Sequence, residues 1–209
     1  MRNTFDRFNG RHQDYQAARP SYAQEFLDWL GELYAPPERY TAADIGSGTG
    51  KLSAQLLAAG FRVCGVEPNP DMRGAAEALL GGDPRFSSSN GTDHDTGLPD
   101  RSVDMVAAAQ AFHWFDGPAF ARECRRILRP GGRAVLVWNV RGAAPMNQAL
   151  AQVFREHCPS FHGFTGGMGE DDPRIRDFFG GAYEKRRFPN PLTLDRDQFL
   201  RRCFSGASP

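Results

Sequence analysis

Three closely spaced glycines and a carboxylate that follows them are the residues of this chain whose spacing could bind a ligand. Gly46, Gly48 and Gly50 alternate with small hydroxyl residues, and Glu67 follows Gly50 by 17 residues. Glycines this dense let the backbone turn sharply and approach a ligand where a Cβ would clash, and a helix behind them offers free N–H groups. A carboxylate about 20 residues past such a turn accepts hydrogen bonds from ribose hydroxyls, each worth roughly 1.5–3 kcal/mol. The pattern therefore predicts a nucleoside-binding site.

The glycine spacing departs from the dinucleotide-binding fingerprint at one position. That fingerprint needs its third glycine where this chain has Lys51. A nicotinamide-dependent oxidoreductase on a similar sheet is therefore the weaker alternative. A tight turn that binds nothing is a further alternative for the glycines alone, and Glu67 argues against it. Asp44, just before the glycines, is either part of the site or a charge partner of the helix N-terminus.

The elements that must position these residues alternate between short apolar strands and amphipathic helices. Strands are predicted at residues 40–45, 61–66, 85–90, 102–109, 134–138 and 183–188. Helices are predicted after the glycine turn from Leu52 and at residues 22–34, 72–80, 118–128, 145–158 and 195–203. The run 102–109 is almost continuously apolar, which is typical of a parallel strand buried on both faces. The alternation indicates an α/β fold with a doubly wound, mostly parallel sheet and helices on both of its faces.

Two stretches resemble the class I S-adenosylmethionine-dependent methyltransferases. The first is Asp44-x-Gly46-x-Gly48-x-Gly50 followed by Val66-Glu67-Pro68, and the second is Leu128-x-Pro130-Gly131-Gly132 before an apolar strand. The resemblance implies a Rossmann-like methyltransferase sheet, in which the second stretch is a structural turn where proline and glycine stop a helix and redirect the chain. Members of that family continue into another helix and a final antiparallel strand. The C-terminal edge of the sheet is therefore expected to be incomplete or completed differently.

The resemblance also implies which residues hold S-adenosyl-L-methionine. The backbone of Gly46 and Gly48 would meet its amino acid part, with Asp44 nearby as an acidic orienting group. Glu67 would hold the ribose, and Gln110 would lie beside the methionine moiety. The implied cofactor-binding set is Tyr15, Arg19, Asp44, Gly46, Ser47, Gly48, Gly50, Glu67, Pro68, Asp93, His94 and Gln110.

The N-terminal segment and the loop after residue 90 supply the less regular members of this set. Tyr15-x-x-x-Arg19-Pro20-x-Tyr22 resembles the N-terminal cover of the type 11 branch, in which the arginine meets the methionine carboxylate. An ordinary amphipathic lead-in helix is the alternative. Asp93-His94 stands where the family commonly has Asp-Ala or Ala-Glu, which is a departure. A backbone N–H of this pair can still serve the adenine ring, and a side-chain contact is left open.

His113 is the candidate catalytic residue. It follows the predicted central strand and is flanked by Phe112, Trp114 and Phe115. An imidazole could take a proton from a hydroxyl, carboxyl or amine acceptor, and such help is typically worth about 10²–10⁴-fold in rate. The alternative is a histidine that packs against the aromatic wall and orients it. Trp114 could offer a π face to a cationic sulfonium, or it is a plain core aromatic.

Composition favours a small-molecule acceptor. The 209 residues include 25 basic and 25 acidic side chains, so no basic excess points to nucleic acid. The four cysteines lie far apart without metal-like spacing, which predicts buried thiols in a reducing cytosol and no metal site. No run approaches 18 apolar residues and the first residues lack an apolar signal region, so a cytoplasmic protein without membrane contact is expected.

One domain spanning residues 1–209 is expected at this length. It would comprise an N-terminal cover (1–38), a cofactor-binding core (40–138) and acceptor-side and C-terminal elements (139–209). The predicted function is methyl transfer from S-adenosyl-L-methionine to a small-molecule acceptor by in-line displacement. A non-catalytic protein that binds the same cofactor is the alternative from a different class. The acceptor and the oligomeric state are left open.

Overall fold

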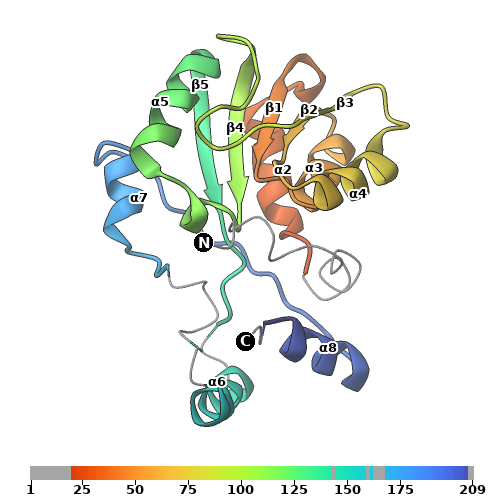
Figure 1. The fold of residues 1–209 in the computed structure, drawn as a ribbon, viewed down its shortest axis with the longest axis vertical. Coiled ribbons are helices and arrows are strands. Elements are labelled where there is room, and N and C mark those ends of the chain that lie inside the picture. Colours follow the sequence, from red (N-terminus) through yellow and green to blue (C-terminus); the bar gives the residue numbers. More distant parts are fainter. Residues whose placement is uncertain (1–19, 143–144, 159–160, 162–167, 207–209) are drawn as a thin grey trace.

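A parallel sheet of five strands forms the centre of the molecule. The computed structural model describes residues 20–142, 145–158, 161 and 168–206. The strands are β1 (Thr41–Ile45), β2 (Arg62–Val66), β3 (Phe86–Ser89), β4 (Val103–Ala109) and β5 (Leu128–Val137). Their order is β3-β2-β1-β4-β5, so the chain steps outward from β1 and then returns to place β4 on its other side (Figure 1). The predicted doubly wound α/β sheet is confirmed.

Helices cover both faces of the sheet. The helices of this core are α2 (Gln24–Leu33), α3 (Lys51–Ala58), α4 (Pro70–Leu80), α5 (Gly117–Ile127) and α7 (Pro173–Phe178). Successive residues of a strand point to opposite faces. Accordingly, Ala43 and Ile45 pack in the core cluster that contains α5 and α7, whereas Ala42 packs in the cluster that contains α2 and α3. Because both faces are covered, the strands read as continuous apolar runs.

Local sequence signals explain where the helices of the core begin. Asn69 caps α4, because its side-chain oxygen accepts hydrogen bonds from the N–H groups of Asp71 and Met72, both at 3.0 Å. Asp116 caps α5 by accepting from the N–H of Ala119 at 3.0 Å. In both helices a proline occupies the first turn, where no N–H is needed. These caps direct the N-termini of the helices toward the carboxyl edge of the sheet.

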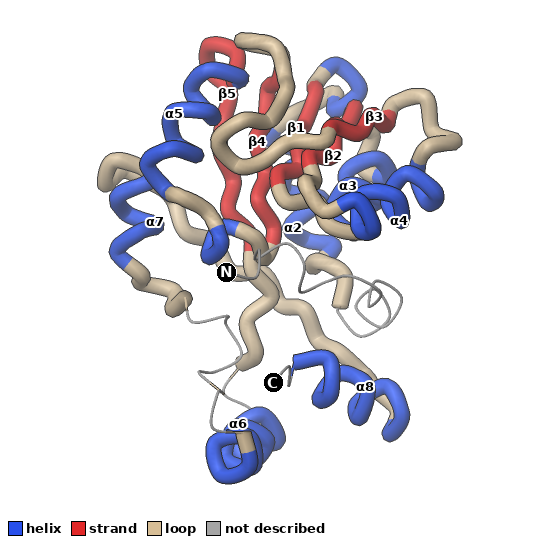
Figure 2. The backbone as a smooth tube through the Cα atoms, viewed as in Figure 1, coloured by secondary structure: helices blue, strands red, loops and turns tan. Residues whose placement is uncertain are grey.

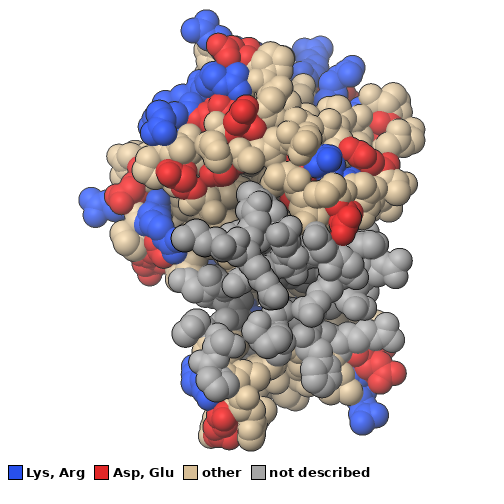
Figure 3. Space-filling model, viewed as in Figure 1, with Lys and Arg blue, Asp and Glu red and all other residues tan. Residues whose placement is uncertain are grey.

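Two helices lie apart from the layered core. They are α6 (Pro145–His157) and α8 (Arg196–Gly206), which Figure 2 shows away from the sheet. None of the residues of α6 is buried. On the face of the molecule drawn in Figure 3, basic and acidic side chains are intermixed over the core. Within the described ranges, the chain has no helix that is both long enough and apolar enough to cross a bilayer.

The predicted strand at residues 183–188 is wrong. These residues form a segment without regular secondary structure. Lys185 pairs with Glu170 at 3.2 Å, and the ring of Phe188 packs on α2, 5.9 Å from that of Trp29. The side chains of this segment are therefore engaged by a loop and a helix, and no described strand lies beside it to complete a hydrogen-bond ladder. Its charged and aromatic side chains dock the segment on these elements instead.

The region of β5 differs from its prediction in detail. A turn was expected at residues 129–132, before a strand at 134–138. In the structure β5 is continuous from Leu128, and the turn is an irregularity within it: Val103 pairs with Leu128, whereas Met105 pairs with Arg133. The short helix α7 was not predicted. The other predicted strands and helices are confirmed, with ends shifted by a few residues. The single-domain boundary stays a prediction.

Candidate functional site

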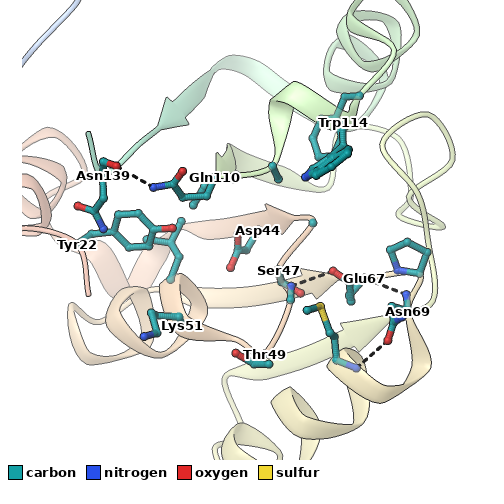
Figure 4. Close-up of a pocket in the computed structure, with 18 of the residues that line it drawn as sticks. Tyr22, Asp44, Ser47, Thr49, Lys51, Glu67, Asn69, Gln110, Trp114 and Asn139 are labelled. Carbon is teal, nitrogen blue, oxygen red and sulfur yellow. Dashed lines mark hydrogen bonds between the residues drawn. The ribbon is translucent and has the colours of Figure 1, made fainter. Parts of the chain in front are cut away.

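A pocket lies at the carboxyl ends of β1, β2 and β4, where the strand order reverses. Ligands of doubly wound sheets bind at this kind of position, because the connections on either side diverge to opposite faces. Figure 4 shows its side chains, with Asp44 between Gln110 on one side and Glu67 on the other. The lining residues are Pro20, Tyr22, Asp44, Gly46, Ser47, Gly48, Thr49, Lys51, Leu52, Glu67, Pro68, Asn69, Met72, Ala109, Gln110, Ala111, Trp114, Phe115 and Asn139.

The three glycines of the turn serve different purposes. All have a positive φ, +69° at Gly46, +57° at Gly48 and +81° at Gly50, a region that side-chain-bearing residues rarely adopt. A Cβ on Gly46 would lie 2.8 Å from the Cβ of Ala111, so the pocket wall leaves no room for one. Gly50 is not among the described lining residues, and a Cβ there would lie 2.9 Å from Leu80. Gly50, predicted to bind cofactor, is therefore needed for the packing of α3 against α4.

The N–H groups of the turn are engaged within the protein. Those of Gly46 and Ser47 both donate to the carbonyl oxygen of Val66, at 2.9 and 3.1 Å. That of Gly48 donates to Oε2 of Glu67 at 2.9 Å. The turn is thus held against the end of β2. A contact of the backbone of Gly46 or Gly48 with the amino acid part of the cofactor stays a prediction.

Glu67 connects the glycine turn to the start of α4. The residue is 7% exposed, and its carboxylate accepts hydrogen bonds from the N–H groups of Gly48 and Asn69, both at 2.9 Å. Burial raises the pKa of Glu67, and the two backbone hydrogen bonds oppose that rise. A carboxylate has about four acceptor sites, so acceptor capacity remains for ligand hydroxyls. Sequence reasoning placed Glu67 in the site but missed that it also braces the glycine turn.

Asp44 is a buried carboxylate with one unsatisfied oxygen. The residue is 1% exposed, and its Oδ2 accepts a hydrogen bond from the hydroxyl of Ser53 at 2.7 Å. Among the described residues, its Oδ1 is buried with no hydrogen-bond partner. Burial raises the pKa of Asp44 to about 6, although the hydrogen bonds from Ser53 lower it. An unpartnered buried oxygen costs roughly 1–3 kcal/mol, which a ligand donor would relieve.

Gln110 stands at the end of β4 in a strained conformation. Its φ is +55°, and a residue other than glycine held in this region costs about 1–3 kcal/mol. The conformation is held by two hydrogen bonds: the N–H donates to the oxygen of Val137 at 2.8 Å, and Nε2 donates to the oxygen of Asn139 at 3.2 Å. Gln110 lies in the pocket wall, as the sequence predicted. Asn139 also lines the pocket and was not predicted to do so.

The aromatic wall includes Trp114 but not His113. Trp114 lines the pocket and is 49% exposed, so it lies at the mouth. His113 is not among the described lining residues, and its ring centroid lies 4.8 Å from that of Trp114. This contact fits the alternative in which the histidine orients the aromatic wall. A catalytic role for His113 stays a prediction.

Asp93 and His94 lie outside the described lining of the pocket. Oδ1 of Asp93 lies 3.0 Å from Nδ1 of His94, and Oδ2 accepts a hydrogen bond from the N–H of Asp116 at 3.0 Å. The side chain of Asp93 therefore fixes Asp116, the N-cap residue of α5. A contact of this pair with an adenine ring stays a prediction.

The N-terminal cover is described only from Pro20 onward. Tyr15 and Arg19 lie outside the described residues. Pro20 and Tyr22 do line the pocket, and the main chain of Tyr22 makes two hydrogen bonds with the side-chain amide of Gln55 in α3, at 2.9 and 3.0 Å. The segment before α2 thus reaches the pocket rim.

Several other lining residues were not singled out from sequence. Thr49, Lys51 and Leu52 continue the glycine turn into α3, while Asn69 and Met72 belong to the cap and first turn of α4. The sequence predicts that Asn69 caps a helix, but the place of Asn69 beside the pocket follows from the packing of α4 on the sheet.

Comparison with known proteins agrees with this geometry. A family model described as a methyltransferase domain matches residues 43–136, from β1 into β5. An uncharacterized methyltransferase of Mycobacterium tuberculosis is 42% identical over 127 residues, which is 61% of this chain and 49% of that protein. A methyltransferase-like protein of Schizosaccharomyces pombe is 32% identical over 153 residues, 71% of this chain and 59% of that protein. The chain spans about half the length of the curated relatives it matches.

Solved structures extend the similarity to the fold. A protein of Anaeromyxobacter dehalogenans, described as a type II methyltransferase, is 32% identical with a TM-score of 0.55, covering 84% of this chain and 70% of that one. One from Anabaena variabilis, described as a methyltransferase from an antibiotic biosynthesis pathway, is 25% identical with a TM-score of 0.59, covering 79% of this chain and 63% of that one. The fold is the one that these solved methyltransferase structures share. The chain belongs to the class I S-adenosylmethionine-dependent methyltransferase family.

The pocket fits the cofactor of this family. Oδ1 of Asp44 is a buried acceptor without a partner in the described residues, and it could accept a hydrogen bond from a ligand ammonium group. Glu67 presents a carboxylate at the far side of the same pocket. Gly48 leaves open space at the pocket wall, since a Cβ there would meet only Sδ of Met72 at 3.9 Å. These three features suit a ligand with a cationic amino acid end and a hydroxyl-bearing ribose.

Proposed function

We propose that this chain binds S-adenosyl-L-methionine in the pocket at the carboxyl edge of the sheet and transfers its methyl group to a small molecule. The observation that carries the proposal is the buried Oδ1 of Asp44 in the pocket wall, which has no hydrogen-bond partner in the part of the chain that the structure describes. A buried carboxylate is costly unless it is paired. A ligand with an ammonium group would supply the pair, and a ligand without one would leave the penalty in place.

The residues that would hold the cofactor act from opposite sides of the pocket. Asp44 would orient the ammonium group, and Glu67 would accept hydrogen bonds from the ribose hydroxyls. The glycine turn would let the backbone come close to the bound cofactor. When bound, the cofactor supplies a methyl group on a cationic sulfur, which is already an activated leaving group. The protein therefore needs chiefly to align two molecules and exclude water, and alignment can contribute roughly 7–11 kcal/mol in favourable models.

A small acceptor is favoured over a nucleic acid. The chain has no net charge, and neutralisation of phosphates by basic residues dominates nucleic-acid binding. The exposed indole of Trp114 at the mouth offers an apolar surface for a small acceptor. All four cysteines are free, in keeping with the proposed cytoplasmic location.

Calorimetric titration with S-adenosylhomocysteine tests the binding half of the proposal. We expect saturable 1:1 binding, competition by S-adenosylmethionine, and no binding of NADH. Tight NADH binding without S-adenosylhomocysteine binding would replace the proposal with an oxidoreductase. Formation of S-adenosylhomocysteine with a panel of small hydroxyl, carboxyl and amine acceptors tests transfer. Binding without turnover across the panel would favour the non-catalytic alternative, for which the position of His113 outside the described pocket wall provides the structural argument.

Replacing Glu67 by alanine should weaken S-adenosylhomocysteine binding. Loss of charge-assisted ribose contacts corresponds to roughly 1.5–3 kcal/mol, or about a 10- to 150-fold higher Kd, measured by calorimetry. The matched control is Glu77→Ala on α4, which removes an exposed pair with Arg73 at 3.8 Å and should change Kd by less than about twofold. Equal affinity in the wild-type protein and Glu67→Ala would refute the role of this carboxylate.

A further inference from the structure

The segment of residues 186–190, here called the strap, docks on α2 beside the pocket. The guanidinium of Arg186 lies over the ring of Trp29, 5.1 Å from its centroid. The ring of Phe188 lies 5.8 Å from that of Phe26 and 5.9 Å from that of Trp29. Phe188 also packs against the core cluster that contains α2 and α3. An apolar anchor and a cation–π contact therefore fix the strap to the outside of the core.

The strap ends at a pair of asparagines that bind the main chain of the N-terminal segment. Nδ2 of Asn190 donates to the oxygen of Ser21 at 2.8 Å and to Oδ1 of Asn139 at 2.9 Å. Nδ2 of Asn139 donates to the oxygens of Pro20 and Ser21, at 3.3 and 3.2 Å. Two side-chain amides thus hold two consecutive carbonyl groups. We call this arrangement of Asn139 and Asn190 the clasp.

The clasp is continuous with the pocket wall. Asn139 lines the pocket, and its own carbonyl oxygen accepts the hydrogen bond from the side chain of strained Gln110. Figure 4 shows Asn139, Gln110 and Tyr22 together on one side of the pocket. From the opposite direction, Gln55 of α3 holds the main chain of Tyr22. Residues 20–22 are therefore fixed at the rim from two sides, by α3 and by the clasp.

We propose that Asn139 and Asn190 are positioning residues that hold residues 20–22 closed over the rim and thereby slow the release of the cofactor. The inference rests on the proposed function, because it concerns the ligand of that pocket. With the clasp broken, residues 20–22 lose their hydrogen bonds to Asn139 and Asn190 and keep those to α3, so the closed rim becomes a smaller fraction of the population. The observed affinity falls in proportion to that fraction, since only the closed form makes all contacts.

The sharpest test is Asn190→Asp, which keeps the shape of the side chain but removes both of its donors. The carboxylate would face the oxygens of Ser21 and Asn139, so the clasp should open. We expect S-adenosylhomocysteine to dissociate about tenfold faster in stopped-flow measurements. The KM for S-adenosylmethionine should rise while kcat at saturation stays unchanged. In the ligand-free protein, amide hydrogen exchange should accelerate in residues 21–23 and not in α3.

The control is Asn147→Asp in α6. Asn147 also donates a side-chain hydrogen bond to a main-chain oxygen, that of Gly142 at 2.9 Å, but it does not line the pocket within the described residues. This variant should match the wild-type protein in dissociation rate, in KM and in amide exchange of residues 21–23. Arg186→Ala provides a second route to the same effect, because it weakens the strap on α2 without altering either asparagine.

The outcomes separate this inference from the proposed function. Wild-type dissociation and exchange rates in both Asn190→Asp and Arg186→Ala would overturn the inference while leaving the proposed function intact. If the wild-type protein does not bind S-adenosylhomocysteine, the proposed function is wrong, and slowed cofactor release is wrong with it. The exchange measurement on ligand-free protein then still decides whether the clasp positions residues 20–22.

Discussion

Gly46→Ala should destabilise the protein by roughly 2–5 kcal/mol. The φ of +69° costs an L residue about 1–2 kcal/mol. The new Cβ would also lie 2.8 Å from the Cβ of Ala111 and 3.2 Å from the ring of Phe115, and forced overpacking costs about 1–3 kcal/mol. Ala111 lies two residues past the end of β4 and is buried, so its Cβ has little room to move away. Urea unfolding monitored by circular dichroism measures the loss.

Gly48→Ala separates the cost of backbone strain at a positive φ from the cost of a steric clash of the added Cβ. Gly48 has a similar positive φ of +57°, but a Cβ added there would meet only Sδ of Met72 at 3.9 Å, an ordinary contact. This variant should therefore lose only the conformational contribution, about 1–2 kcal/mol. A Gly46→Ala protein as stable as Gly48→Ala would show that the wall at Ala111 yields to a methyl group, which would contradict the close fit described above.

Asp44→Asn should change how stability depends on pH. The pKa of Asp44 is raised from 3.8 to about 6 in the folded protein, so the folded state binds more protons between these values and stability falls as pH rises there. The contribution of the protonated carboxyl is complete below about pH 4 and is lost as pH rises through about 6. The difference corresponds to roughly 3 kcal/mol. Relative to the asparagine variant, wild-type stability should therefore decline by up to this amount between about pH 4 and pH 8.

The comparison between the two proteins isolates the carboxyl. The asparagine changes packing and hydrogen bonding by a constant amount at every pH, so the pH-dependent difference in denaturation midpoints reports the ionisation of Asp44 together with its repulsion of the Glu67 carboxylate. A difference that stays flat across this range would refute the raised pKa. The ligand should reverse the trend: an ammonium beside Asp44 favours the ionised form, so wild-type affinity for S-adenosylhomocysteine should rise with pH through about 6. The affinity of Asp44→Asn should be lower and independent of pH in that range.

Glu67 links these two experiments. Because its carboxylate holds the N–H of Gly48 as well as that of Asn69, it couples the shape of the glycine turn to the end of β2. The two carboxylates of the pocket also oppose each other, since the charge of Glu67 contributes to the raised pKa of Asp44. A cationic ligand between them would relieve this repulsion. The acidic pair therefore suits a positively charged ligand better than a neutral or anionic one.

Features of the site that depend on near neighbours in sequence were predictable. The glycine turn, the strand that enters it and the cap of α4 at Asn69 follow from local backbone preferences, which act within a few residues. The apolar runs of β1, β2 and β4 predicted a sheet buried on both faces. The strand predicted at residues 183–188 is wrong because a strand forms there only where a second strand is available to pair. The structure brings Trp29 and Glu170 there instead.

The sequence by itself determined the fold class, the position of the pocket and the residues Asp44, Gly46 and Glu67 within it, because each is set by a short motif at a defined place in a parallel sheet. Only the tertiary structure decided that Gly50 serves helix packing, that Glu67 braces the turn, and that Asn190 meets Ser21 although 169 residues separate them. The reason is physical: hydrogen bonds and steric contacts between distant segments depend on the angles at which helices and strap pack on the sheet, and no local pattern encodes those angles.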